Sequence, residues 1–488
     1  MISKLAALLL VFCITGSAQI LRGPMTLNPE QETWLTGDMQ KTANLLHTRA
    51  ARPDANEVLL YNTGYIHYLM GEDNEALNYF QKALDKNPDY PYAYLKMAEI
   101  YEKTGNILGA LMHIKRVSDN HGDDYEVMLA LARMYVLNGK KVEAERLYQD
   151  LISNFDEKIE PRIALAAIYR RAKKFEEAQK ILEENMKIYP EDILLKEKAR
   201  LYLAMGRKDK AAKYLLDMCD DYPFNEEIQQ YRDSLQTIYG VAYTPKNYDP
   251  PVYRYRINPQ ERLDYVVKYG FVTLGWLNVR MLDAQILNGR KVYPIRFFVN
   301  SNPAFGMIIE LHALYEAYID AQSMNTIRSR AYTQGDGRYL AREYNFLYDE
   351  GIFRARIIYT DGRFEKLEKP LPSSAQDGVS MLYYARGVVS NKTGGTTTVV
   401  IDEEYKFGHI KYLNETESLE INDQDVEAVK IFARAEFKGV AGMNGDAWGW
   451  LSSDPQHIPL RGKVSIIVGS ITLDVDEDAE DNVIDGKE

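Results

Sequence analysis

The chain has 488 residues, which is enough for two or three domains that each bury a core of their own. Its hydrophobic content of 46% and charged content of 27% are ordinary for a globular protein. The formal net charge of −12 argues against sequence-independent nucleic-acid binding, because the chain has no excess of Lys and Arg to displace counterions from phosphates.

Residues 1–18 have the pattern of a secretory signal peptide. Lys4 precedes an apolar run over residues 5–14, and a small-residue stretch ending at Ala18 follows it, so we expect cleavage after Ala18. The run is much shorter than the ~20 apolar residues of a membrane-spanning helix. We therefore expect no transmembrane helix in the mature chain, although a retained anchor is the alternative.

Phe12 stands directly before Cys13, where bacterial lipoprotein signals have a small residue, so no lipid attachment is expected. The sequence thus predicts secretion across the inner membrane and a periplasmic or outer-membrane-associated protein that is not a lipoprotein.

Residues 19–56 are predicted to be an N-terminal capping segment. Residues 28–52 fit one or two helices that end at Pro53. Their apolar stripe consists of Trp34, Leu35, Met39, Leu45 and Leu46. Such a segment is expected to cover the open end of a stacked array, as the terminal units of solenoids do.

Residues 57–223 contain a repeated helical pattern. An alanine recurs at intervals of 34, 34, 34 and 33 residues, at Ala76, Ala110, Ala144, Ala178 and Ala211. A residue for the turn between two helices stands five positions earlier: Gly71, Gly105, Gly139, Lys173 and Gly206. The pattern resembles the tetratricopeptide repeat. The resemblance implies five helix pairs stacked into a right-handed superhelix, with each first helix on the concave face and a capping helix reaching residue 239.

The concave face of such an array predicts a binding groove. Its first two repeats supply aromatic and aliphatic side chains, and its later repeats supply basic ones. The candidate groove residues are Tyr61, Tyr65, Tyr68, Tyr92, Leu95, Arg133, Arg170, Arg171, Lys196 and Arg200. We expect a protein or peptide partner that is apolar at one end and acidic at the other.

Two alternatives to an open groove remain at this point. The N-terminal helices could pack over the tyrosines. The basic side chains could form a solvated face that is balanced by acidic neighbours such as Glu99, Glu102 and Glu126.

Beyond the array, the pattern changes from helical to extended. Residues 240–259 carry four prolines and are predicted to be a Pro/Tyr-rich linker. Residues 260–475 then show alternating apolar and polar positions, as in residues 263–269 and 353–359, and are predicted to form antiparallel strands. Turn sequences separate them at Asn288-Gly289, Asp336-Gly337, Asp349-Glu350-Gly351 and Asp361-Gly362.

Two helical interruptions are expected among these strands. Residues 303–315 place Met307, Ile308, Leu311 and Leu314 on one helical face, and residues 378–385 fit a shorter helix. Residues 476–488 are predicted to be an acidic disordered tail.

Several phrases in the second half resemble the bacterial family labelled domain of unknown function 3108. They are residues 269–276 (YGFVTLGW), 377–386 (DGVSMLYYAR), 450–454 (WLSSD), 458–461 (IPLR) and the closing strand 464–473. The resemblance covers about residues 255–475. It implies an exported protein with a curved, barrel-like antiparallel sheet, and it brings no catalytic residues. The expected fold class is thus a multidomain α+β protein with an all-α superhelix before an antiparallel β domain.

A second candidate site lies in the β domain. Trp448, Trp450, Asp454 and Arg461 could form a polar site beside exposed indoles, which suits a sugar, or Asp454 and Arg461 could be a structural ion pair. The seven histidines show no metal-binding or catalytic spacing. The sequence therefore predicts no enzyme, no cofactor and no metal.

Three functions are consistent with these patterns. The first is a non-enzymatic interaction scaffold of the bacterial cell envelope, whose repeats recruit a protein or peptide and whose β domain contacts an envelope component. The second is a carrier that binds lipid or glycan in the β domain, if its interior is a cavity and not a filled core. The third is an unrecognised hydrolase of envelope polymers.

Overall fold

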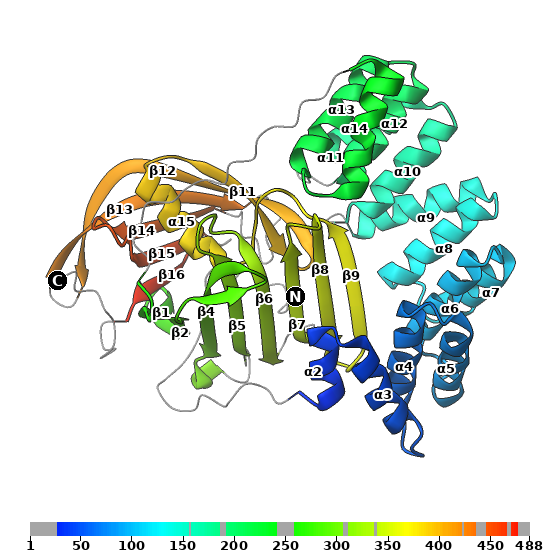
Figure 1. Cartoon of the computed structure of the whole chain (residues 1–488), viewed down its shortest axis with the longest axis horizontal. Helices are drawn as coiled ribbons and strands as arrows, with labels where there is room; N and C mark the ends of the chain where they lie inside the picture. The colour runs from blue at the N-terminus through cyan, green and yellow to red at the C-terminus, as the bar shows by residue number, and fades with distance from the viewer. Residues whose placement is uncertain are drawn as a thin grey trace.

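A computed structural model of the chain describes residues 27–155, 158–185, 192–241, 258–305, 311–335, 339–421, 424–435, 446–465 and 470–476. Helices occupy the first part, up to Tyr239, and strands begin at Arg262 (Figure 1). The expected signal peptide, residues 242–257 of the expected linker and residues 477–488 of the expected tail lie outside the described residues.

The helical part follows the predicted repeat frame. Helices α4 to α13 form five antiparallel pairs, preceded by α2 and α3 and followed by α14. The helices are α2 (Pro29–Thr36), α3 (Met39–Ala50), α4 (Glu57–Leu69), α5 (Asp73–Lys86), α6 (Pro91–Lys103), α7 (Ile107–Ser118), α8 (Tyr125–Leu137), α9 (Lys141–Asn154), α10 (Glu160–Arg171), α11 (Phe175–Asn185), α12 (Asp192–Ala204), α13 (Lys208–Asp221) and α14 (Glu226–Tyr239). All five repeat alanines are completely buried. The position requires a small residue, because a larger side chain would push the packed helices apart.

The turn inside each repeat requires a left-handed backbone. Gly71, Gly105, Gly139 and Gly206 have φ between 75° and 79°, and an added Cβ would meet no atom within 4 Å at any of them. Glycine is therefore required by the backbone conformation and not by lack of space. In the fourth repeat Lys173 adopts φ 62° at the equivalent position, so this turn bears a steric cost that the others avoid.

We expect Lys173→Gly to stabilise the protein by roughly 0.5–1 kcal/mol, because it removes the left-handed strain at the cost of some chain entropy. The urea denaturation midpoint should rise accordingly. The matched control is Gly139→Ala, which introduces the same strain in the third repeat and should lower the stability by about 1 kcal/mol. Equal midpoints for Lys173→Gly and the wild type would contradict this explanation.

The strands form one 16-stranded sheet, in the order β10-β11-β12-β13-β14-β15-β16-β1-β2-β4-β5-β6-β7-β8-β9, with β3 paired to β4. The strands are β1 (Arg262–Tyr269), β2 (Val272–Met281), β3 (Gln285–Leu287), β4 (Arg290–Ser301), β5 (Leu311–Asp320), β6 (Thr326–Gly335), β7 (Tyr339–Leu347), β8 (Ile352–Tyr359), β9 (Phe364–Pro370), β10 (Ala375–Gln376), β11 (Gly395–Ile401), β12 (Glu404–Ile421), β13 (Gln424–Ala435), β14 (Asp446–Ser452), β15 (Pro459–Ser465) and β16 (Ser470–Val475).

All strand pairs are antiparallel except β10 with β11, which confirms the predicted antiparallel domain. The sheet curves strongly, as expected, but the described strands leave it open, with β9 and β10 at its two edges (Figure 1). The predicted turns at residues 288–289, 349–351 and 361–362 connect β3 to β4, β7 to β8 and β8 to β9. Asp336-Gly337 lies outside the described residues.

Helix α15 (Ser380–Asn391) packs against the sheet and confirms the second expected interruption, although it extends further than predicted. Val379 and Tyr383 join the largest hydrophobic core, together with inward residues such as Tyr265 and Ile295. Arg386 of this helix is fully buried and donates to both carboxylate oxygens of Glu261, at 2.7 and 2.9 Å. Pairing and hydrogen bonding offset the desolvation of the two charges.

The first expected interruption, a helix over residues 303–315, is wrong. Pro303–Phe305 form a 3-10 turn and strand β5 begins at Leu311, while residues 306–310, with Met307 and Ile308, lie outside the described residues. Inward positions of β5 alternate as Ala313, Tyr315, Ala317 and Ile319, all buried. The predicted helix rested on apolar spacing that includes Leu311 and Leu314. Pairing of β5 with β4 and β6 decided the conformation instead.

Candidate functional site

The first helix of the array, α4, binds the edge of the sheet through hydrogen bonds between its side chains and backbone groups of the sheet. The side-chain amide of Asn62 donates to the Gly362 carbonyl at 2.9 Å and accepts from the Phe364 N–H at 2.9 Å. The Tyr65 hydroxyl accepts from the Lys366 N–H at 3.0 Å. Because β9 is an edge strand, these side chains pair backbone groups that a neighbouring strand would otherwise satisfy.

Aromatic contacts reinforce this first joint. The indole of Trp34 stacks on Phe364 with ring centroids 5.1 Å apart, and its Nε1 donates to the Ile357 carbonyl at 3.1 Å. The Arg363 guanidinium lies between the rings of Tyr92 and Tyr359, at 3.7 and 3.9 Å from their centroids. The β8–β9 turn therefore fills the aromatic end of the groove.

This joint changes two expectations. Tyr61 and Tyr65 are buried, with 1% and 2% of their surface exposed, so they are not open contacts for a peptide. The Trp34 ring lies 6.0 Å from that of Tyr65, as the covering by N-terminal helices implied, and strand β9 provides the hydrogen bond to the Tyr65 hydroxyl. Helix α3 packs against α4, as expected of a cap, whereas α2 also contacts strands β7 and β8, and its Glu32 pairs with Arg330 of β6 at 3.6 Å.

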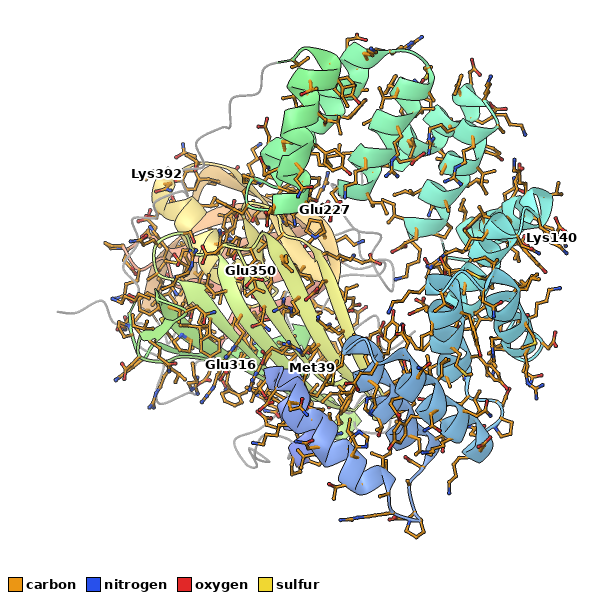
Figure 2. All side chains as sticks on the ribbon, turned by 45° about the vertical axis from the view of Figure 1, so that its right-hand side comes forward. Met39, Lys140, Glu227, Glu316, Glu350 and Lys392 are labelled. Atoms are coloured by element: carbon orange, nitrogen blue, oxygen red, sulfur yellow. The ribbon has the colours of Figure 1, made fainter. Side chains whose placement is uncertain are left out.

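The other end of the array meets the same edge region of the sheet. The Asn225 side chain donates to the Gly351 carbonyl at 3.0 Å, and the Ser373 N–H donates to the Asp221 carbonyl at 3.1 Å. Between the two joints, Lys158 pairs with Glu404 at 2.9 Å. Figure 2 shows Met39 at the first joint, Glu227 and Glu350 at the second, and Lys140 on the outer side of the array, away from the sheet.

A channel of about 620 Å³ lies between the concave face of the array and the β8–β9 turn. Its walls come mainly from the first helices of the repeats, as predicted, together with Tyr359, Arg363 and Glu365 from the sheet. Seven of the ten candidate groove residues line it: Tyr61, Tyr92, Leu95, Arg133, Arg170, Arg171 and Arg200.

The other three candidate groove residues do not line the channel. Tyr65 is committed to β9, and Tyr68 stacks on Tyr65 with centroids 6.1 Å apart. Lys196 pairs with Asp192 at 2.9 Å and with Glu227 at 3.7 Å.

The basic side chains of the channel are neutralised by acidic neighbours. Arg133 pairs with Glu102, and Arg170 with the buried Glu197 at 2.6 Å. Arg200 approaches the same Glu197 at 3.6 Å. The structure therefore favours the balanced charged face over a dedicated anion site.

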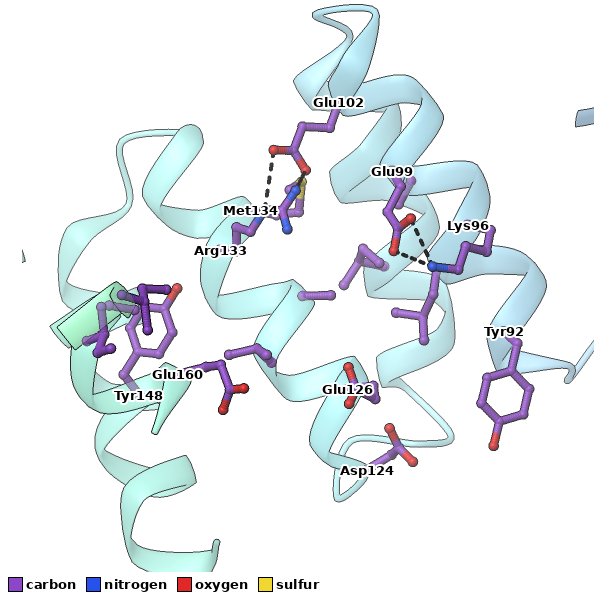
Figure 3. A pocket seen from close by; sticks show the side chains of 18 of the residues that line it. Tyr92, Lys96, Glu99, Glu102, Asp124, Glu126, Arg133, Met134, Tyr148 and Glu160 are labelled. Atoms are coloured by element: carbon purple, nitrogen blue, oxygen red, sulfur yellow. Dashed lines mark hydrogen bonds and ion pairs between the residues drawn. The ribbon is translucent and has the colours of Figure 1, made fainter. Parts of the chain in front are cut away.

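Three carboxylates lie in the middle of the channel, and of these the sequence had pointed only to Glu126, as an acid that balances the basic face. Asp124 precedes α8, Glu126 lies in its first turn, and Glu160 begins α10 (Figure 3). Asp124 accepts from the Val127 N–H at 3.1 Å, and Glu160 accepts from the Tyr125 hydroxyl at 3.1 Å. Within the part of the chain that the structure describes, no Lys or Arg forms an ion pair with any of the three.

A repeat-position comparison would have found two of these acids. Tyr92, Glu126 and Glu160 are spaced by 34 residues, so they hold the same position in three successive repeats. Figure 3 shows the three side chains projecting from successive first helices of the array. Glu126 is exposed at the channel surface, and partial desolvation together with repulsion by Glu365 and Glu160 raises its pKa to about 7.

The four candidate residues of the β domain do not form one open site. Trp450 is buried, and its Nε1 donates to Glu417 at 2.7 Å, while Trp448 packs at the edge of the main core. Arg461 pairs with Asp474 at 2.5 Å, whereas Asp454 accepts from the Gln456 N–H at 2.6 Å within its own turn. The indoles are thus not exposed, and the expected pairing of Asp454 with Arg461 is not formed.

The described residues contain no group of three or more His, Cys, Asp and Glu side chains that could hold a metal ion. In the same part of the chain, none of the helices combines the length and the apolar character needed to cross a membrane.

Comparison with known proteins supports both halves. Residues 264–476 match the model of "Protein of unknown function (DUF3108)", residues 64–105 match "TPR repeat" and residues 126–157 match "Tetratricopeptide repeat". The chain therefore carries tetratricopeptide repeats followed by a DUF3108 domain, in the predicted order.

Solved structures resemble the helical part. A tetratricopeptide repeat protein from Parabacteroides merdae is 20% identical over 41% of this chain and 79% of its own, with a TM-score of 0.36. PilW, a type IV pilus biogenesis factor, is 14% identical over 41% of this chain and 94% of its own, with a TM-score of 0.37. A thermophilic TPR protein of Thermus thermophilus is 21% identical over 37% and 98%, with a TM-score of 0.33.

We expect Asn62→Ala to destabilise the joint between array and sheet by about 1–3 kcal/mol, because it leaves the buried Phe364 N–H without its partner. The urea denaturation midpoint measures this loss. The control is Asn44→Ala, on the exposed side of α3, which should leave the midpoint nearly unchanged. Equal midpoints for the two variants would contradict a stabilising role of the Asn62 contacts.

Proposed function

We propose that this protein is an exported, non-enzymatic scaffold of the bacterial cell envelope, whose channel binds an extended segment of a partner protein. The channel between the array and the β8–β9 turn carries this proposal. Its volume of about 620 Å³ falls in the range of ligand sites, and its lining mixes apolar and charged side chains. Tetratricopeptide repeats are in general interaction modules, which supports a protein as the partner.

The first joint favours an extended partner over a helical one. Asn62 and Tyr65 of α4 already hold an extended backbone, that of β9, through its N–H and C=O groups. The channel continues from this point along α6, α8 and α10. An extended segment can therefore follow the same wall of first helices beyond the β8–β9 turn.

Anchoring at both ends supports a rigid binding surface. Hydrogen bonds from Asn62 and Asn225 hold the two ends of the array to one region of the sheet. In this proposal the sheet sets the curvature of the array, so the binding site loses little entropy when a partner enters.

A substitution that fills the channel tests the binding role. Ala164 lines the channel, so Ala164→Trp should block it, whereas Ala204→Trp, on an exposed position outside it, should not. Short random peptides selected on the full chain should bind the Ala204→Trp variant normally and the Ala164→Trp variant at least tenfold more weakly, by fluorescence anisotropy. Equal binding by both variants would place the peptide site elsewhere.

Export rests on residues 1–18 and is tested separately. When the full chain is expressed in a Gram-negative host, the mature protein should appear in the periplasmic or outer-membrane fraction with Gln19 as its first residue, as measured by mass spectrometry of the intact protein. Deleting residues 2–18 should retain it in the cytoplasm. An uncleaved chain in the cytoplasmic fraction would contradict the export part of the proposal.

A further inference from the structure

The charges in the channel are paired unevenly. Of the basic residues that line it, five have an acidic partner: Lys96 with Glu99, Arg133 with Glu102, Arg170 and Arg200 with Glu197, and Arg363 with Glu365. Arg171 ends α10, about 16 Å along that helix from Glu160, which exceeds the screening length of about 8 Å at physiological salt. The middle of the channel therefore carries the negative charge of Asp124, Glu126 and Glu160, which Lys158 offsets only in part.

Aliphatic side chains lie next to two of these acids. Leu129 follows Glu126 and Ile163 follows Glu160 by three residues, so each pair shares one face of its helix, and all four line the channel. Lys and Arg side chains have this same combination of an apolar stem and a charged end. A carboxylate beside an aliphatic surface is complementary to both parts.

The chain itself shows a cation at the start of this row. The Arg363 guanidinium contacts the ring of Tyr92, pairs with Glu365 at 3.2 Å and lines the same channel. Glu126 and Glu160 occupy the position of Tyr92 in the next two repeats. One repeat position thus faces a cation in the second repeat and presents a carboxylate in the third and fourth.

We propose that the channel selects an extended polypeptide segment bearing Lys or Arg side chains, which pair with Glu126 and Glu160 and continue the row that Arg363 begins on Tyr92. This inference rests on the proposed function and specifies the partner's chemistry. It reverses the acidic partner expected from the sequence, because the arginines that suggested it are already paired within the protein.

The ionisation of Glu126 agrees with this geometry. Its pKa of about 7 reflects partial desolvation and repulsion by Glu365, Glu160 and Asp124, which Lys158 offsets in part. A bound cation would stabilise the charged carboxylate and lower that pKa. Binding of a cationic segment should therefore strengthen as the pH rises from 6 to 8, because Glu126 loses its proton in this window.

The test uses the full mature chain and three fluorescein-labelled probes of equal length: oligolysine, oligoglutamate and an uncharged Gly-Ser peptide. Oligolysine should bind most tightly by fluorescence anisotropy, and more tightly at pH 8 than at pH 6. The double variant Glu126→Gln/Glu160→Gln should weaken it at least tenfold and flatten the pH dependence.

A matched control separates the channel from the general charge of the protein. Glu176→Gln/Glu177→Gln removes the same charge from exposed positions in α11 that do not line the channel, and it should bind oligolysine as the wild type does. Thermal unfolding of both double variants verifies that they fold. Equal weakening by the two double variants would overturn the inference, as would oligoglutamate binding as tightly as oligolysine or no binding of oligolysine at all.

The test also distinguishes this inference from the proposed function. Suppose that the selected peptides no longer bind the Ala164→Trp variant but bind the Glu126→Gln/Glu160→Gln variant normally. The channel would then bind peptides without selecting cations, so the inference would fail and the proposed function would stand. If selected peptides bound Ala164→Trp normally, both would fail.

Discussion

The structure depends on the contact between one asparagine and the edge of a large open sheet. Asn62 satisfies a carbonyl and an amide of the β8–β9 segment at once, in the geometry that a neighbouring strand would provide. An exposed edge strand is a template for unwanted pairing, and covering it with a helix is one of the ways in which proteins protect it. Here the covering helix is the first helix of the repeat array, so protection of the sheet and placement of the array have the same cause.

That contact also decides what remains of the groove. The β8–β9 turn places Arg363 against Tyr92, which occupies the aromatic end of the concave face with the chain's own residues. The second joint, through Asn225 and Gly351, closes the arc at its other end. What is left is a channel whose central carboxylates lie at the starts of two helices. Its character is therefore more acidic than the row of arginines along the repeats suggests.

Most of the architecture could be predicted from the sequence, because it follows from short-range patterns. The 34-residue spacing located the helix pairs, and the glycines marked the left-handed turns. Alternating residues such as those of β8 identified strands. The prediction failed at residues 303–315, where the helical spacing of Leu311 and Leu314 is overridden by the cross-strand pairing of β5. The candidate site was predicted in part: seven groove residues line the channel, and Glu102 and Glu126 were named as balancing acids, but Glu197, Asp124 and Glu160 were not recognised.

The sequence by itself determined the repeat frame, the order of the two halves and the identity of the concave face, since each depends on periodicity within one or two neighbouring elements. Only the tertiary structure decided that the β8–β9 turn enters that face. Residues 62 and 364 are about three hundred positions apart, and no local pattern encodes a hydrogen bond between a helix side chain and a distant strand edge. The pairing of Arg133 with Glu102 and of Arg170 with Glu197 depends on how successive repeats stack. For that reason the sequence located the groove, while the packing of the array against the sheet determined its charge.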